Sequence, residues 1–310
     1  MITNETVKSN RHFPSDGKCI QAKTGRCLLC NSTEGRQVMQ EGAYVALKCD
    51  CGLIFIDPAP DDSAFDQRLD PHHRVYYSGP AKARAKWVSK FKNKGLLLDV
   101  GCGHGEFAKA AIAQGFTVEG MEPADSRAKH AESGLGIKVH RSFIEDNTVQ
   151  KNRYDVVFHV DMLSHFPDPI KSLQAMGKLL KSDGVICFEV GLHETLSPFW
   201  RRFSGRGNMP AHRWFYGSES VRHVLDKAGF KLIATRRYNI GPSNILSKIL
   251  LQTFKPDVIS GKSGMTVRPM ASGPAASLYY RVHMWLRYGF GRWVPTGGPT
   301  TAFVAAIPKG

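Results

Sequence analysis

The chain has 310 residues, of which 42% are hydrophobic and 22% charged, and its formal net charge is +15. This length suffices for one α/β domain with a substantial core and small additional units. It contains no apolar run long enough to span a membrane, and its first seventeen residues are polar, so we expect neither a spanning helix nor a secretory signal. Three of the seven cysteines, Cys19, Cys102 and Cys187, are isolated. This pattern excludes a disulfide framework and favours the reducing cytoplasm.

The positive charge is concentrated in the last third of the chain. Residues 201–310 contain 17 basic and 3 acidic residues and so carry +14 of the net charge of +15. Such asymmetry favours an acidic partner, such as a phosphate-bearing lipid, a nucleotide-sugar, an anionic glycan or a nucleic acid. The alternative is a basic surface that serves only solubility.

The N-terminal part of the chain predicts a flexible tail over residues 1–23 and a small cysteine-bearing unit over residues 24–58. The unit contains two close pairs of cysteines, C-x-x-C at residues 27–30 and C-x-C at residues 49–51. Four thiolates on two short turns suit a tetrahedral Zn²⁺ ion, and so small a unit lacks a core without one. Residues 57–60, Asp-Pro-Ala-Pro, predict a stiff extended link to the next unit.

Beyond residue 75 the pattern alternates between helices and strands, and no internal repeat is apparent. We expect helices over residues 80–93, 106–114, 124–133, 168–181 and 218–228, and strands over residues 96–100, 116–122, 137–140, 154–160, 184–190, 231–238 and 301–307. About sixty residues between the last two strands are not needed to build the core, and we treat residues 241–299 as an insertion.

The first of these strands leads into the most informative segment, Leu-Leu-Leu-Asp-Val-Gly-Cys-Gly-His-Gly at residues 96–105. Glycine allows the backbone to turn sharply and to approach a ligand closely, and the following helix offers unpaired N–H groups. The next strand ends in Glu122, which is placed to accept hydrogen bonds from ribose hydroxyls. A dinucleotide site favours G-x-G-x-x-G, whereas this turn reads G-x-G-x-G and is followed by Glu106. Asp99 suits a cationic amino group instead.

The segment Leu97–Gly105 resembles the first motif of class I S-adenosylmethionine (SAM) methyltransferases, and Glu122 matches the ribose-binding acid of their second motif. The resemblance covers residues 27–240 and the last strand. It implies a Rossmann-like, seven-stranded α/β sheet whose last two strands pair antiparallel at one edge, built from residues 75–240 and 300–310. It also implies SAM as cofactor, with these binding residues: Asp99, Gly101, Cys102, Gly103, Glu122, Ser142, Phe143 and Val160. Asp99 would hold the methionine amino group, and Ser142 and Phe143 would lie at the adenine edge.

The cysteine unit resembles the zinc-ribbon leader found on a subset of these methyltransferases. The resemblance implies that Cys27, Cys30, Cys49 and Cys51 hold a structural zinc ion. In that subset the second pair is normally C-x-x-C, and here one residue is missing. The tighter spacing leaves three alternatives open: a distorted turn, recruitment of Cys19 or a histidine, or loss of the metal.

Residues 159–169, His-Val-Asp-Met-Leu-Ser-His-Phe-Pro-Asp-Pro, resemble a loop of ubiquinone-type and related O-methyltransferases. A helical turn would place Asp161 and His165 on one face, beside the methyl donor. A neutral histidine suits removal of the acceptor proton, so His165 is the first candidate for the base and His212 the second. The alternative is a histidine that only supports the loop. The family often has Glu where this chain has Ser164, which weakens a metal site at this loop.

Two further segments combine aromatic and basic residues. Residues 193–216 suit a sugar or an isoprenoid phosphate, and equally an unpaired RNA base. In the insertion, Leu278, Val282, Trp285 and Leu286 share one helical stripe, with Arg287 opposite. This segment suits peripheral contact with a membrane interface, or a lid or dimer surface packed on the core.

The sequence therefore predicts a SAM-dependent methyltransferase that acts by in-line displacement. The leading interpretation is O-methylation of a glycan, a lipid-linked sugar or another small acidic metabolite. One alternative is an RNA methyltransferase acting on a base ring nitrogen or on ribose, although the chain has no Asn/Asp-Pro-Pro-Tyr motif. The other is a non-catalytic SAM-binding scaffold protein. The oligomeric state stays open.

Overall fold

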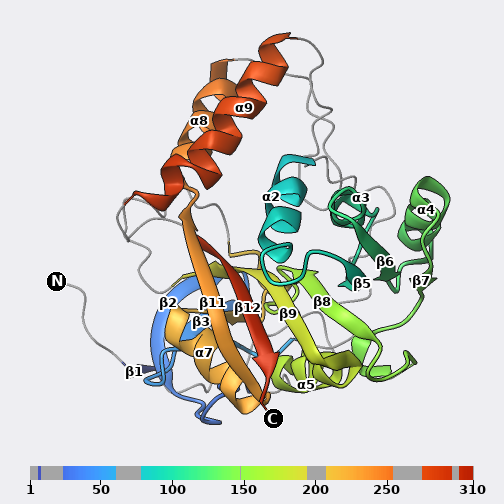
Figure 1. Ribbon diagram of the computed structural model, residues 1–310. Coiled ribbons are helices and arrows are strands. Elements are labelled where there is room, and N and C mark those ends of the chain that lie inside the picture. Colours follow the sequence, from blue (N-terminus) through green and yellow to red (C-terminus); the bar gives the residue numbers. More distant parts are fainter. Residues whose placement is uncertain are drawn as a thin grey trace.

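The computed structural model describes residues 6–7, 24–60, 78–146, 148–193, 207–253, 274–294 and 300–309. These residues form two sheets with helices packed around the larger one (Figure 1). The predicted tail lies outside the described residues except for Thr6–Val7, which form a short strand, β1. No helix in the described part of the chain combines the length and apolarity needed to cross a membrane.

The larger sheet has seven strands in the order β11-β12-β9-β8-β5-β6-β7. Their bounds are β5 Gly95–Val100, β6 Phe116–Met121, β7 Val139–His140, β8 Tyr154–Val160, β9 Leu180–Leu192, β11 Phe230–Asn239 and β12 Thr300–Pro308. The strands β5 to β9 pair in parallel, whereas β12 pairs antiparallel with both β9 and β11. The predicted class I methyltransferase fold is thus confirmed, including the antiparallel pair at one edge.

Helices cover both faces of this sheet, which is why β5 and β8 read as nearly continuous apolar runs. One face packs against α2 (Ser78–Val88) and α3 (Glu106–Ile112), with Leu97, Phe158 and Cys187 in its core. The other packs against α5 (Pro169–Leu179) and α7 (Ser218–Lys227). Most boundaries agree with expectation to within two residues, and two differ more: β9 begins at Leu180, and α2 ends at Val88 and continues as turns.

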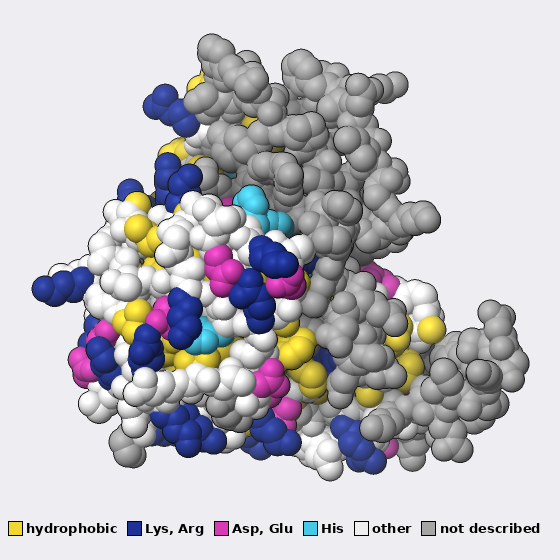
Figure 2. All heavy atoms as spheres, turned by 90° about the vertical axis from the view of Figure 1, so that its right-hand side faces the viewer, with side chains coloured by type: hydrophobic (Ala, Val, Ile, Leu, Met, Phe, Trp, Pro, Cys, Tyr) yellow, Lys and Arg dark blue, Asp and Glu magenta, His cyan; other side chains and the backbone are white. Residues whose placement is uncertain are grey.

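The side of the sheet near β7 carries α4 (Asp125–Leu135) and a short helical turn, η1 (Ile144–Asp146). Figure 2 shows this side with basic and acidic side chains interspersed over the described residues. Arg141 illustrates the pattern, because it pairs with Asp125 at 2.8 Å and with Glu132 at 2.7 Å. Such pairing is consistent with the near-neutral charge of the first two thirds of the chain.

The smaller sheet has the order β1-β2-β3-β4-β10 and contains the cysteine unit. Its strands are β2 Gly35–Glu41, β3 Tyr44–Lys48, β4 Ile54–Asp57 and β10 Trp214–Phe215. The last of these comes from a much later segment and was not predicted. Leu29, Leu47 and Phe55 of this unit share one apolar core with the α5 and α7 face of the larger sheet.

The insertion contributes two helices, α8 (Gly241–Thr253) and α9 (Pro274–Tyr288), followed by the turn η2 (Phe290–Arg292). They form a hairpin that projects beyond the sheet (Figure 1). The predicted stripe of α9 is largely exposed: Leu278 is 62% and Trp285 is 60% accessible to solvent. The opposite face, which bears Arg287, turns toward the sheet instead.

Candidate active site at the carboxyl ends of the parallel strands

The strand order reverses between β5 and β8, and open α/β sheets bind ligands at the carboxyl ends of strands at such a point. After β5 the chain enters the glycine turn, which is fixed by hydrogen bonds from the N–H groups of Gly101 and Cys102 to the Met121 carbonyl oxygen, at 2.8 and 3.1 Å. Gly101, Gly103 and Gly105 all have positive φ. A Cβ added at Gly103 would meet no atom within 4 Å of it among the described residues, so the backbone is open to a ligand there.

Two buried acids flank this turn. Glu122 accepts hydrogen bonds from the N–H groups of Gly103 (3.1 Å) and Ala124 (3.0 Å), which ties it to the turn. Asp99 has one carboxylate oxygen, Oδ2, with no hydrogen-bond partner among the described residues. Burial raises the pKa of Asp99 to about 8, despite the opposing effect of Arg84. An unsatisfied buried acceptor beside an open turn fits a ligand that brings its own donor, such as an ammonium group.

The other predicted cofactor residues lie around the same edge with different roles. Cys102 contributes its backbone to the turn, whereas its thiol is buried against Gly120, where an added Cβ would lie 2.6 Å from Sγ. Ser142 accepts a hydrogen bond from Thr148 at 2.9 Å, and the Phe143 N–H donates to Asp146 at 2.8 Å. These two residues follow β7, and half-buried Val160 ends β8.

The three predicted catalytic side chains come together after β8. One ligand atom each from Asp161, His165 and His212 lies within 4.8 Å of the others. His212 Nε2 is 3.7 Å from Asp161 Oδ2, and the two imidazole rings are 4.6 Å apart. His165 Nδ1 donates to the Ala211 carbonyl oxygen at 2.9 Å, since a carbonyl can only accept. In neutral His165 the lone pair therefore resides on Nε2.

Residues 210–216 lie across the loop that follows β8 and fix the position of His212. The Arg213 N–H donates to the Ser164 carbonyl at 2.8 Å, and Trp214 Nε1 donates to the Phe166 carbonyl at 2.9 Å. The Tyr216 hydroxyl donates to the Leu163 carbonyl at 3.0 Å. His212 is far from His165 in the sequence, and this set of contacts is what brings the two histidines together.

Two other histidines of this region are unsuited to proton transfer near neutral pH. His159 is fully buried and stacks on Phe188 with ring centroids 4.7 Å apart, and burial lowers its pKa to about 3. Burial likewise lowers the pKa of His193 to about 4. Both rings are therefore neutral near pH 7.

Three charged residues, buried Glu189 and two half-buried arginines, adjoin this site and were not predicted from the sequence. Arg84 of α2 and Arg287 of α9 both contact Glu189 of β9, with N–O distances of 2.7 and 3.1 Å. The signal in the sequence is that Glu189 interrupts the predicted apolar strand over residues 184–190. It is a weak signal, because neither arginine is near Glu189 in the chain.

The four predicted metal ligands also come together, at the base of the smaller sheet. Cys27 and Cys51 have sulfur atoms 3.3 Å apart, as do Cys30 and Cys49, and all four sulfurs lie within 4.8 Å of one another. Sulfur atoms around a tetrahedral zinc ion are separated by about 3.8 Å. The sulfurs of the C-x-C pair therefore lie close enough to those of the C-x-x-C pair to share one such ion. Burial raises the pKa of Cys49 to about 11. Cys19, the alternative ligand, lies outside the described residues.

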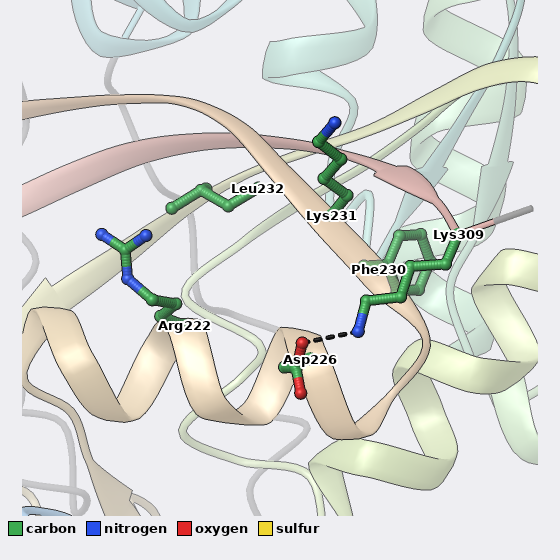
Figure 3. Close-up of a pocket in the computed structure, with 6 residues that line it drawn as sticks. All are labelled: Arg222, Asp226, Phe230, Lys231, Leu232 and Lys309. Atoms are coloured by element: carbon green, nitrogen blue, oxygen red, sulfur yellow. Dashed lines mark hydrogen bonds and ion pairs between the residues drawn. The ribbon is translucent and has the colours of Figure 1, made fainter.

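A separate depression of about 220 Å³ lies between α7 and the ends of β11 and β12 (Figure 3). It is lined by Arg222, Asp226, Phe230, Lys231, Leu232 and Lys309. Lys309 Nζ points at Asp226 Oδ1 from 2.5 Å. This depression contains none of the residues of the cofactor turn or the histidine cluster.

Comparison with known proteins agrees with this geometry. The chain is 37% identical over 113 residues to a ubiquinone biosynthesis O-methyltransferase of Actinobacillus pleuropneumoniae, covering 33% of this chain and 48% of that protein. It is 38% identical over 107 residues to the enzyme of that name from Vibrio atlanticus, covering 31% and 45%. The chain thus spans about half the length of the curated relatives it matches.

Among solved structures, the [4+2]-cyclase SpnF is similar in fold, with a TM-score of 0.50 and 16% identity over 76% of this chain and 84% of that one. A cyclase with this fold shows that the fold alone does not assign a reaction. The sequence carries the family assignment instead. The methyltransferase domain family matches residues 72–235, more than half of the chain, and the chain therefore belongs to the methyltransferase domain family.

Proposed function

We propose that this chain is a SAM-dependent methyltransferase that methylates a hydroxyl group of a small acidic metabolite, a glycan or a lipid-linked sugar. The observation that carries the proposal is the placement of two groups at one reversal of strand order. Asp99 lies near the end of β5 and is followed by the open glycine turn, whereas Asp161 and His165 follow β8 and meet His212 there. The names of the curated relatives support an oxygen as the accepting atom.

The residues around the turn fit the parts of SAM. Asp99 Oδ2 would accept from the amino group, and Glu122 would bind the ribose hydroxyls. The open side of Gly103 would admit the methionine part, and Ser142 and Phe143 would border the adenine. When bound, SAM supplies an electrophilic methyl group on a positively charged sulfur.

The histidine cluster would handle the proton of the acceptor. His165 Nε2 would remove the hydroxyl proton as the oxygen attacks, because the tautomer fixed by Ala211 places the lone pair on this atom. Asp161 and His212 would orient the acceptor and stabilise the imidazolium. Alignment of oxygen, methyl carbon and sulfur would supply most of the rate enhancement, since displacement at a methyl group is governed by positioning.

The four cysteines would hold a structural zinc ion. With four protein ligands the ion has no open position for a substrate, so it would act on folding and not on chemistry. Two turns prepare the site through hydrogen bonds: Cys27 N–H donates to Ser32 O at 2.8 Å, and Cys49 N–H to Leu53 O at 2.9 Å.

The exposed side chains of the α8–α9 hairpin support peripheral contact with a membrane. Leu278, Val282 and Trp285 form an exposed apolar stripe, and Trp293 is 77% accessible with Arg292 above its ring at 5.7 Å. Tryptophan beside arginine suits the interface of an anionic bilayer. Anionic lipid is favoured over an acidic protein because the exposed residues form a linear helical stripe on a projecting element.

The function is tested with purified protein, labelled SAM and fractionated cell extract. Label in a small-acid, glycan or lipid fraction that is lost in His165→Ala would support the proposal. Label in RNA would replace it with the nucleic-acid alternative. Tight SAM binding without label in any fraction would favour a non-catalytic scaffold.

A further inference from the structure

A group of charged residues, one buried and two half-buried, lies on the same face of the sheet as Asp99 and next to the histidine cluster. Glu189 pairs with Val160 in the β8–β9 register, and its carbonyl oxygen accepts from the Asp161 N–H at 2.9 Å. Its carboxylate accepts from Arg84 Nε at 2.7 Å and from Arg287 Nη2 at 3.1 Å. Glu189 therefore connects α2 and α9 to Asp161, a residue of the proposed acceptor site.

The charges of this group do not balance. Arginine stays protonated in proteins, so the group contains two guanidinium ions and one carboxylate. Burial acts against ionisation of Glu189, yet the two arginines lower its pKa, so it is charged near neutrality. Asp161, the next acid, has a half-exposed side chain and lies 3.7 Å from His212, with which it pairs. The side chains of Arg84 and Arg287 are only 16% and 20% exposed. Two largely desolvated cations that share one carboxylate favour an anionic ligand.

The same place holds donors without acceptors. Arg287 Nε and the Tyr288 hydroxyl are buried and have no hydrogen-bond partner within the described ranges. The Tyr288 ring is packed against Tyr238 and Phe303, with ring centroids 5.0 and 5.7 Å away, so its position is well determined. The Arg287 guanidinium lies 5.3 Å from the centre of the Tyr288 ring. Buried donors of this kind are normally satisfied, and a ligand oxyanion would supply the missing acceptor.

We propose that Arg84, Arg287 and Tyr288 form the binding site for a carboxylate or phosphate group of the methyl acceptor. This inference rests on the proposed function, because it makes the anion the handle by which the acceptor is held beside Asp161 and His165. Glu189 keeps the two guanidinium groups in place, and α9 serves as a specificity element. The insertion thereby acquires a role in substrate recognition.

The competing explanation is that Arg84, Glu189 and Arg287 only tie the two helices to the sheet. Anion affinity separates the two explanations. Protein saturated with S-adenosylhomocysteine is titrated with inorganic phosphate, and in parallel with acetate, by calorimetry. Arg287→Met removes the charge, and Arg287→Lys keeps it but loses the planar fork. Tyr288→Phe removes only the hydroxyl. Arg281→Met, at an exposed position of the same helix, is the matched control.

We expect saturable binding of at least one anion, weakened about tenfold or more by Arg287→Met, which is the size of one lost charge-assisted hydrogen bond. Tyr288→Phe should weaken it less, Arg287→Lys should retain part of it, and Arg281→Met should leave it unchanged. If binding of phosphate depends on Arg287, the acceptor carries a phosphate group. If binding of acetate does, the acceptor carries a carboxylate. Equal binding by Arg287→Met and the unaltered protein, an equal loss in Arg281→Met, or no saturable binding overturns the inference.

The affinity for S-adenosylhomocysteine is measured first, and it tests the proposed function separately from the anion site. If the protein does not bind it, the proposed function fails. If the protein binds it normally but no anion binding depends on Arg287 or Tyr288, only the anion site fails. Tyr288→Phe keeps this test decisive if Arg287→Met does not fold, because the phenyl ring preserves the packing against Tyr238 and Phe303.

Discussion

Trp214 pairs with Phe55, joining the segment that carries His212 to the cysteine unit. The indole N–H of the same tryptophan donates to the Phe166 carbonyl in the loop that carries His165. A second contact reinforces the connection, because the Glu41 carboxylate accepts from the Met209 N–H at 2.9 Å. The smaller sheet is thus a support for the histidine cluster as well as a metal-binding unit.

This connection predicts how loss of the metal affects the protein. Cys27→Ser should abolish stoichiometric zinc binding and lower methyl transfer, because β4 would no longer hold β10 and His212. SAM affinity should change little, since the glycine turn lies outside this unit. Zinc content, turnover and SAM affinity are measured together on protein purified without chelator. Cys187→Ala, a buried cysteine of β9, is the control and should retain zinc. Protein with full activity and no zinc would contradict the proposed site.

The tautomer fixed by Ala211 predicts the effect of removing His165. His165→Ala should lower turnover by about 10²- to 10⁴-fold, the usual contribution of a general base, with SAM affinity unchanged. His212→Ala should have a smaller effect on turnover. His223→Ala changes an exposed residue of α7 and serves as the control. If turnover by His165→Ala is undiminished, His165 is not the general base and only supports the loop.

Replacing Asp99 by Asn should have opposite effects on the stability of the free protein and on SAM binding. Its pKa rises from an ordinary value of 3.8 to about 8 through burial, so the folded chain holds a proton that the unfolded chain releases. The stability from this residue is present below pH 3.8 and is lost as the pH rises through 8. Asp99→Asn should therefore stabilise the free protein at pH 8 and flatten this dependence, while weakening SAM binding.

Thermal unfolding across this pH range and SAM affinity at one pH measure the two effects of Asp99→Asn. The same pH dependence in both proteins would show that Asp99 is not the titrating group. Unchanged SAM affinity would remove Asp99 from the cofactor site.

The exposed stripe of α9 predicts binding to anionic vesicles. The double change Leu278→Ser and Trp285→Ser should reduce flotation with phosphatidylglycerol-containing liposomes at low salt, because it removes apolar area from the interface. Ile233→Ser alters an exposed apolar residue of β11 and should leave flotation unchanged. Failure of the unaltered protein to float with these liposomes would exclude membrane contact by this helix.

Sequence reasoning succeeded where the physical signal is local. The apolar run of β8, the glycine turn and the acid at Glu122 each follow from neighbouring residues, and the predicted strand over residues 154–160 matches the structure. β10 could not be foreseen, because two residues carry no periodicity and their partner strand lies in another unit. The contact of Arg287 could not be foreseen, because its partner Glu189 lies on a strand that is distant in the sequence. A helix wheel ranks the faces of α9 by apolar area and contains no information about such a partner.

The position of β12 has a consequence for biosynthesis. Among the described strands it is made last, yet it lies between β9 and β11 and pairs with both. A growing chain can assemble β5 to β9 and the glycine turn early, whereas β11 has no described strand partner until β12 leaves the ribosome. Proteolysis of ribosome-stalled chains that end before and after β12 should show protection of the first part in both and of β11 only in the longer one. The cofactor half would thus mature before the half that carries α9, so that recognition of the acceptor is the last property the nascent protein acquires.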